Sequence, residues 1–153
     1  MTSVCDNKSV GVIVKNLKGN MLLIERARFP FALAPPAGHI DDHGSSLDAA
    51  VQEVFEEVGI SLGKEGLVHV VKNRCIENRC RRGGAFHDWD VYEATIASNV
   101  FTPSSEETSG ARWYTPVQLR RLAGKTRRHA NVGQRSDLLE AVWLDFFSEL
   151  DLV

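Results

Sequence analysis

The sequence lacks any long apolar run, any internal repeat and any low-complexity tract. Spanning a bilayer takes about 20 consecutive apolar residues, so no segment qualifies as a membrane-spanning helix, and the amino terminus has no basic-then-apolar signal pattern. The 153 residues, of which 43% are hydrophobic, can bury a good core and predict a single domain over residues 1–153. The expected location is cytoplasmic.

Cysteine is scarce, and the three cysteines are an odd number. This argues against a secreted disulfide framework and suits a reducing compartment. Cys75, Cys80, His87 and Asp88 lie close together in the sequence, but their spacing matches no standard zinc finger or ribbon. Thiols within or beside a strand usually behave as small buried hydrophobes, so we favour packing over a zinc site for these cysteines.

Charge is unevenly spread, although the formal net charge is only −2. No Lys or Arg occurs from Gly38 to Ser61, whereas residues 38–57 contain six acidic side chains. The reverse holds in residues 120–135, where six Lys or Arg residues stand without an acid. A near-neutral chain lacks the basic footprint of a nucleic-acid-binding module. The segregation instead predicts basic segments that meet a polyphosphate held beside the acidic one.

Three glutamates, Glu53, Glu56 and Glu57, fall three or four residues apart and share one face of a predicted helix. Like charges at this spacing destabilise a helix by roughly 0.2–0.5 kcal/mol per pair. Gly59 predicts the helix end, which places two of these carboxylates in the last turn, where the helix dipole favours cations. The cluster is therefore either a solvated acidic face or a site for a hard divalent cation, which carboxylate oxygens suit.

The same helix is predicted to be amphipathic. Ser45 or Ser46 can cap its start, and the helix is expected to end at about Val58. An apolar stripe opposite the glutamates is formed by Val51, Val54, Phe55 and Val58. We expect this stripe to face the core and the glutamates to lie on the open side.

Apolar runs separated by Gly-containing turns predict two hairpins and one further strand. The expected strands are residues 10–14, 21–24, 67–76, 86–97 and 111–114. Thr115-Pro116 is typical of a helix start, and this helix is expected to run toward Leu122. A last helix is expected from about Gly133 or Ser136, with an apolar stripe of Leu138, Leu139, Val142, Trp143, Phe146 and Phe147.

The residues from Gly38 to Ile60 resemble a Nudix box. The signature of this box begins with Gly, five residues of any type, Glu and seven further residues. It continues with Arg-Glu, an aliphatic residue, one residue, Glu-Glu, one residue, Gly and a final aliphatic residue. After Gly38, the matching residues are Glu53, Val54, Glu56, Glu57, Gly59 and Ile60. Two positions depart, since Gly44 replaces the first Glu and Gln52 replaces the Arg. In the family these two side chains commonly pair beneath the metal site, and losing both costs less than orphaning one charge.

The resemblance covers essentially the whole chain and implies an α+β protein with the Nudix fold, an α/β/α sandwich with a mixed β-sheet between helices. It also implies a hydrolase in which Mg²⁺ or Mn²⁺ promotes attack of water on a nucleoside diphosphate linked to another moiety. Glu53, Glu56 and Glu57 are then the expected catalytic and metal-binding side chains. The backbone carbonyl near Gly38 is expected as a further ligand, because glycine allows close approach of the main chain.

Residues outside the box are expected to complete the site. Family members place the general base on a box glutamate or on a late loop, so Glu106 and Glu107 are candidate catalytic residues, unless they form a plain solvated turn. Contacts with substrate phosphate are expected from Arg81, Arg82, Arg127 and Arg128, because guanidinium pairs bidentately with phosphate. His87 either lines the substrate cleft or is a surface histidine, since alternate residues of a strand face opposite sides.

The box does not specify the substrate. A nucleoside triphosphate, ADP-ribose, a sugar nucleotide or a dinucleoside polyphosphate fits equally well. A second hypothesis is a catalytically weak or inactive Nudix-fold module that binds a nucleotide for regulation, and only Gly44 and Gln52 favour it. The three surviving glutamates favour the enzyme, because a module without catalysis need not keep a repulsive carboxylate cluster. Family habit and the apolar carboxy-terminal helix leave a homodimer open.

Overall fold

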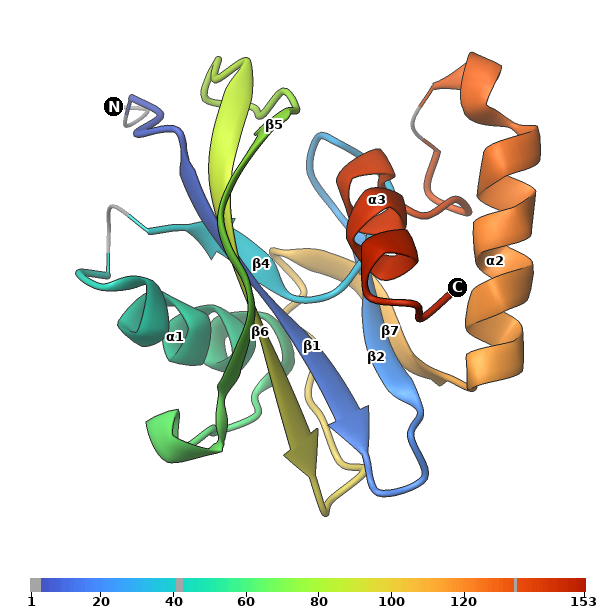
Figure 1. Ribbon diagram of the computed structural model, residues 1–153. Helices are drawn as coiled ribbons and strands as arrows, with labels where there is room; N and C mark the ends of the chain where they lie inside the picture. Colours follow the sequence, from blue (N-terminus) through green and yellow to red (C-terminus); the bar gives the residue numbers. More distant parts are fainter. Residues whose placement is uncertain (1–3, 41–42, 134) are drawn as a thin grey trace.

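The computed structural model describes residues 4–40, 43–133 and 135–153, and within them seven strands form one mixed sheet (Figure 1). Their order is β3-β2-β1-β6-β5, with β4 paired to β1 and β7 paired to β2. Only β1 and β6 pair in parallel among these described strands. The strands are β1 (Lys8–Asn16), β2 (Met21–Arg26), β3 (Leu33–Ala34), β4 (Ala37–His39), β5 (Val68–Glu77), β6 (Phe86–Ile96) and β7 (Thr108–Tyr114).

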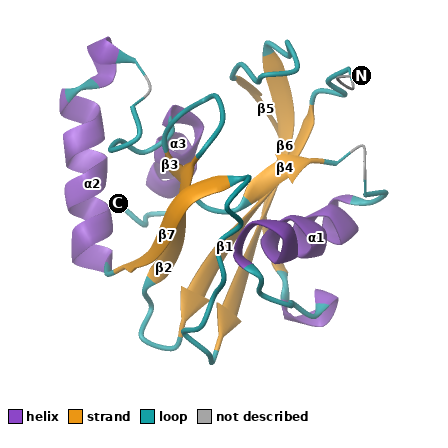
Figure 2. Ribbon diagram, turned by 180° about the vertical axis from the view of Figure 1, so that it is seen from behind, coloured by secondary structure: helices purple, strands orange, loops and turns teal. Residues whose placement is uncertain are grey.

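Helices cover both faces of this sheet, and Figures 1 and 2 show α1 separated from α2 and α3 by the strands. The α-helices are α1 (Ser46–Val58), α2 (Pro116–Arg128) and α3 (Ala141–Glu149), and the short 3₁₀ helices are η1 (Lys64–Gly66) and η2 (Ala130–Val132). The architecture is therefore the expected α/β/α sandwich. None of the helices in the described part of the chain is both long and apolar enough to cross a membrane.

Alternation along the central strand β1 divides the core into two clusters. Val12 belongs to the cluster that packs under α1, together with Val54 of that helix. Ile13 faces the opposite way and packs with Trp143 and Phe146 of α3. Each such fully buried side chain contributes about 1.5–3 kcal/mol to folding. The two clusters hold the sheet rigidly, so the ends of its strands are fixed platforms for side chains.

Both ends of α1 lie where the sequence predicts them. The Ser45 side chain caps the start by accepting a hydrogen bond from the Asp48 amide at 3.1 Å. Gly59 ends the helix in the left-handed conformation, with φ at +68°, and its amide bonds the Phe55 carbonyl. Asp41 and Asp42, two of the six acidic residues between Gly38 and Glu57, lie outside the described residues.

The expected orientation of α1 is wrong in two places. Phe55, placed in the buried stripe, is 53% exposed. Glu57, placed on the open face, is 5% exposed and lies among the buried residues of the helix. The physical reason is that β4 pairs with β1 beside α1 and offers a main-chain amide to Glu57, so a polar contact directs that side chain inward.

The carboxy-terminal third differs from expectation in its helix boundaries. α2 begins as predicted, with a capping box between Thr115 and Gln118, but continues to Arg128. α3 begins at Ala141, later than either expected start. Leu138 and Leu139, two residues of the expected apolar stripe, therefore lie before the helix. The reason is that the backbone of residues 138–140 is hydrogen-bonded to Leu33 on β3. The Leu33 amide donates to the Leu138 carbonyl, and the Glu140 amide donates to the Leu33 carbonyl.

Candidate active site

A cavity of about 410 Å³ opens between α1, β4 and the loop that joins β5 to β6. We call it the carboxylate cavity. It is lined by residues from several separate parts of the chain, among them Arg26, Arg28, Gly38, His39, His43, Glu53, Glu56, Glu57, Arg79, Cys80, Arg81, Arg82, His87, Glu107 and Glu140. The fold thus brings the three box glutamates together with Glu107 and with the arginines of the β5–β6 loop.

Glu57 is the most deeply buried carboxylate of the box. Its Oε2 atom accepts a hydrogen bond from the Ala37 amide at 3.1 Å. Burial, followed by the negative charge of Glu53, raises the pKa of Glu57 well above its ordinary value, and the positive charge of Arg26 opposes this. A buried carboxylate beside a second one is stabilised either by a proton or by a cation. A divalent cation therefore fits this position.

Glu53 lies directly against the backbone of β4. A Cβ atom added to Gly38 would overlap the Glu53 carboxylate, which explains why the first residue of the box is glycine. His43 lies on the other side, with its Nε2 atom 3.1 Å from Glu53 Oε1. One ligand atom each from His43, Glu53 and Glu56 lies within 4.8 Å of the others. The Glu53 carboxylate thus lies beside both the main chain at Gly38 and the His43 ring.

The two departures from the box are both accommodated locally. Gln52 donates a hydrogen bond from Nε2 to Glu56 Oε1 at 2.8 Å and so orients the exposed third glutamate. Gly44 has φ at +90°, a conformation that L side chains rarely adopt, in the turn that precedes α1. The turn in this chain therefore requires glycine at the position where the signature has glutamate.

The loop before β7 is attached to the last turn of α1. Its Thr102 and Ser104 amides bond the carbonyls of Val58 and Glu57 at 2.7 and 2.8 Å, which satisfies acceptors at the helix end. Glu107, at the end of this loop, lines the carboxylate cavity and pairs with Arg28 at 3.2 Å. Glu106 is exposed and does not line the cavity.

The cationic side of the cavity matches the sequence analysis only in part. Arg81 and Arg82 line it, and His87 does so as a buried residue, 1% exposed, so the surface-histidine alternative is wrong. Sequence reasoning missed Arg26 and Arg28. Arg26 ends β2 and Arg28 follows it. The sequence did not indicate where either side chain points, because both reach the cavity only through the position of the distant segment around Glu107 and Thr108.

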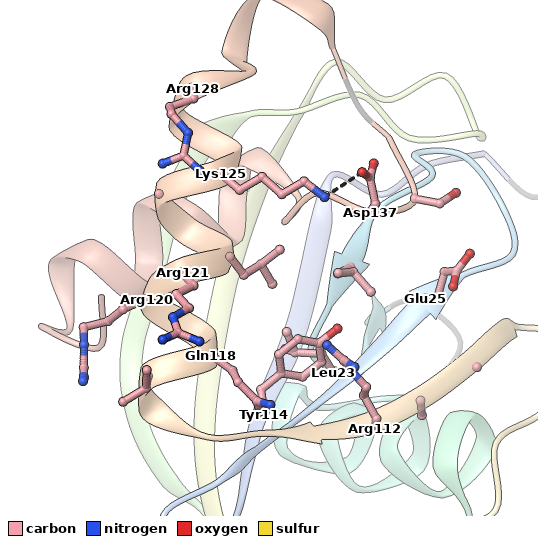
Figure 3. A pocket seen from close by; sticks show the side chains of 17 residues that line it. Leu23, Glu25, Arg112, Tyr114, Gln118, Arg120, Arg121, Lys125, Arg128 and Asp137 are labelled. Carbon is pink, nitrogen blue, oxygen red and sulfur yellow. Dashed lines mark hydrogen bonds and ion pairs between the residues drawn. The ribbon is translucent and has the colours of Figure 1, made fainter.

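Arg127 and Arg128 are not brought to this cavity. A larger hollow of about 1160 Å³ lies along α2, and Figure 3 shows Arg128 on it together with Arg120 and Arg121. We call this hollow the α2 groove. Arg127 instead donates a hydrogen bond to Ser148 Oγ at 3.0 Å, beside α3.

A protein-family model described as the NUDIX domain matches residues 6–135, most of the chain. The chain belongs to this family. Comparison with curated protein sequences finds no match. The matched region includes Glu53, Glu56 and Glu57, three of the glutamates that line the carboxylate cavity.

Solved structures share the Nudix fold with this chain. A MutT protein from Methanosarcina mazei has a TM-score of 0.67 at 18% identity, over 99% of this chain and 96% of that one. An Ap4A hydrolase from C. elegans has a TM-score of 0.59 at 19% identity, over 94% and 96%. A MutT/nudix family protein from Enterococcus faecalis has a TM-score of 0.59 at 22% identity. The match covers 70% of this chain and 42% of that one.

Proposed function

We propose that this Nudix protein is a divalent-metal-dependent hydrolase that cleaves a pyrophosphate bond in a nucleoside diphosphate linked to another moiety. The observation that supports it most strongly is Glu57, a buried carboxylate held by the Ala37 amide and destabilised by Glu53. A chain that only packed its core would gain stability from an apolar residue there. Retention of two facing carboxylates in a cavity suits a cation-binding role.

Glu53 and Glu57 are the proposed ligands, with the Gly38 carbonyl and Glu56 completing the set. When Mg²⁺ or Mn²⁺ is bound there, it polarises a phosphoryl oxygen and lowers the pKa of bound water. Carboxylate oxygens and a main-chain carbonyl are ligands of the type that such hard cations take. His43, in contact with Glu53, fixes the direction of that carboxylate.

Glu107 is the proposed general base, because it lines the cavity whereas Glu106 does not. It accepts a proton from the attacking water, and its ion pair with Arg28 holds it at the cavity wall. The loop that carries Glu107 is bonded to the end of α1, so base and ligands keep a fixed relative position. Arg81 and Arg82 also line the cavity, and their guanidinium groups are the proposed partners of substrate phosphate.

The substrate class is a nucleotide with at least two linked phosphates. The C. elegans structural neighbour is named as an Ap4A hydrolase, and this supports including dinucleoside polyphosphates among the candidates. Nucleoside triphosphates, ADP-ribose and sugar nucleotides complete the set, since each offers a pyrophosphate to the same cation.

The experiment is a measurement of product release from these four substrate classes with Mg²⁺ or Mn²⁺, with Glu57→Gln assayed beside the native protein. Arg127→Ala is the matched control, because Arg127 lies outside the cavity. Turnover that is lost in Glu57→Gln and kept in the control supports the hydrolase. Nucleotide binding without turnover, by folded native protein across the whole panel, would instead support the binding module.

A further inference from the structure

Two cysteines and two histidines meet at the edge of the carboxylate cavity. Cys5 comes from the segment before β1, His39 from the end of β4, Cys80 from the β5–β6 loop and His87 from β6. One ligand atom from each of these residues lies within 4.8 Å of all the others. The four are far apart in the sequence, so only the fold assembles them. Cys75, considered with Cys80 from the sequence, is exposed and is not part of this group.

The distances within the group suit a tetrahedral metal site. Bonds of about 2.3 Å from zinc to sulfur and about 2.0–2.1 Å from zinc to nitrogen place the sulfur and nitrogen ligands about 3.5 Å apart. Cys5 Sγ lies 3.5 Å from His39 Nε2 and 3.2 Å from His87 Nε2. These two distances are close to the spacing that a bound ion would require, and all four ligand atoms lie within 4.8 Å of one another.

The ring of His87 is oriented as in many metal-binding histidines. Its Nδ1 atom lies 3.0 Å from the Asn78 carbonyl oxygen and 3.2 Å from Asn78 Oδ1, which also accepts from Trp89 Nε1. Two acceptors at Nδ1 require that this nitrogen carry the proton. The lone pair of Nε2 then points toward Cys5 Sγ. A histidine that donates its other ring nitrogen to a carbonyl is the usual supporting arrangement at a metal centre.

The two thiols are also positioned by local backbone structure. The Asn7 amide donates a hydrogen bond to Cys5 Sγ at 3.3 Å and so fixes the position of this sulfur. A Cβ atom on Gly84 would press against this sulfur, so glycine there leaves room for it. Cys80 sits in a tight turn, closed by the bonds from the Cys80 amide to the Gly84 carbonyl and from the Gly83 amide to the Cys80 carbonyl, both at 3.1 Å.

We propose that Cys5, His39, Cys80 and His87 form a structural Zn²⁺ site beside the Nudix carboxylates. Two thiolates and two imidazoles are the ligand set of closed, four-coordinate zinc sites, whereas Mg²⁺ and Mn²⁺ prefer the oxygen ligands of the box. The ligand types thus separate two metals across a single cavity. The ion joins the amino-terminal segment and the β5–β6 loop to β4 and β6, and so fixes the loop that carries Arg81 and Arg82.

The first test is the zinc content of the full-length protein, purified without a histidine tag or chelator and kept reduced. We expect one Zn²⁺ per chain in the native protein. Cys5→Ser and Cys80→Ser should each weaken the affinity for Zn²⁺ by at least about 100-fold. Loss of a residue that only supports a metal ligand costs about 10–100-fold, and loss of a ligand itself should cost more. Cys75→Ser is the matched control and should retain the full zinc content. Replacing zinc by Co²⁺ should give the visible absorption of a tetrahedral cobalt–thiolate centre.

Three results would overturn the proposal. One is a failure of the native protein to take up Zn²⁺ after reduction. This result counts equally if the protein was first isolated with a Cys5–Cys80 disulfide and then reduced. Another is zinc loss in Cys75→Ser equal to that in Cys5→Ser. The third is zinc that persists in both ligand variants but is lost in Glu57→Gln, which would locate it at the box. Because this test needs no substrate, it stands whether or not the protein hydrolyses nucleotides.

A second measurement keeps the proposal testable if a variant folds poorly. Trypsin cleaves after arginine, and the β5–β6 loop carries Arg79, Arg81 and Arg82. We expect Zn²⁺ to slow cleavage at these three sites in the native protein and in Cys75→Ser, as followed by mass spectrometry. Cleavage at Arg127 and Arg128, at the end of α2, should not respond to zinc. Equal rates at the loop with and without bound zinc would contradict the structural role.

Discussion

The α2 groove and the carboxylate cavity differ in how they hold their charges. The α2 groove is the larger of the two. Three of its arginines, Arg120, Arg121 and Arg128, are exposed on α2, and its Lys125 is already paired with Asp137 at 2.8 Å (Figure 3). The carboxylate cavity is smaller and encloses Glu57, which is buried and held by a main-chain amide. Exposed, paired charges cost little and require no ligand. A buried carboxylate beside a second one is stabilised by a proton or by a cation, so burial indicates a candidate cation site better than cavity size does.

The largest expected difference between the cavities is in catalysis. Glu53→Gln should lower kcat by about 1,000-fold, because metal catalysis contributes several kcal/mol and each 1.36 kcal/mol is a factor of ten. Arg121→Ala in the α2 groove should change kcat by less than about 3-fold, as expected for a solvated surface charge. Steady-state kinetics with Mg²⁺ measures both. A comparable loss in Arg121→Ala would show that the α2 groove takes part in the reaction.

A second difference concerns substrate phosphate. The double substitution of Arg81 and Arg82 by Ala should raise KM about 10–100-fold, because a hydrogen bond to a charged group contributes about 1.5–3 kcal/mol and exposure reduces that value. The same change at Arg127 and Arg128 should leave KM within about 2-fold. Added salt should weaken the first effect by screening. If the pair on α2 gave the larger change in KM, the basic wall of the site would have been assigned to the wrong segment.

Gly38 offers a sharper probe of the ligand geometry. Gly38→Ala places a methyl group against the Glu53 carboxylate, and overpacking of this kind typically costs about 1–3 kcal/mol. We expect Mg²⁺ affinity to fall by about tenfold or more, as measured by calorimetry. Gly66→Ala is the control, since a Cβ there meets no atom within 4 Å. Unchanged Mg²⁺ affinity in Gly38→Ala would mean that Glu53 does not bind the ion from its observed position.

The smallest expected effect concerns stability and pH. Burial raises the pKa of Glu140, which also lines the carboxylate cavity, and Arg26 opposes this. A raised pKa gives stability that is complete below the ordinary value and is lost as the pH rises through the raised one. Glu140→Gln should remove this loss and raise Tm at pH 8 by roughly 2–4 °C, the change that about 1 kcal/mol gives in a domain of this size. The exposed Glu65→Gln should show no such change, and a lower Tm in Glu140→Gln would reject the explanation.

Local sequence signals predicted α1 well because its boundaries depend on local chemistry. Ser45 and Gly59 cap the helix with their own side-chain and backbone conformations. Its orientation was less predictable, since the spacing of the glutamates does not reveal that Ala37 on β4 offers an amide to Glu57. The prediction of where α3 begins was wrong for the same reason, because the backbone of Leu138 is hydrogen-bonded to Leu33 on a distant strand.

The residues of the two proposed metal sites differ in the same way. The carboxylates share one helix, so their spacing alone indicates a site. Cys5, His39 and Cys80 come from three separate segments, and no spacing rule connects them before the sheet has formed. The β1–β4 register, which pairs Ser9 with His39, places the amino-terminal segment beside β4. Sequence reasoning could therefore predict a site that one helix carries, but it missed the group of cysteines and histidines that the fold brings together.

The most direct test of the account is a titration of the protein with Mn²⁺, followed by electron paramagnetic resonance. Protein supplied with one equivalent of Zn²⁺ should be used, so that the cysteine and histidine ligands are occupied. We predict that native protein and Arg121→Ala bind Mn²⁺ equally well and that Glu57→Gln binds it at least about 100-fold more weakly, since it lacks the buried carboxylate charge. Equal Mn²⁺ binding by Glu57→Gln and native protein would contradict the claim that the carboxylate cavity holds the catalytic cation.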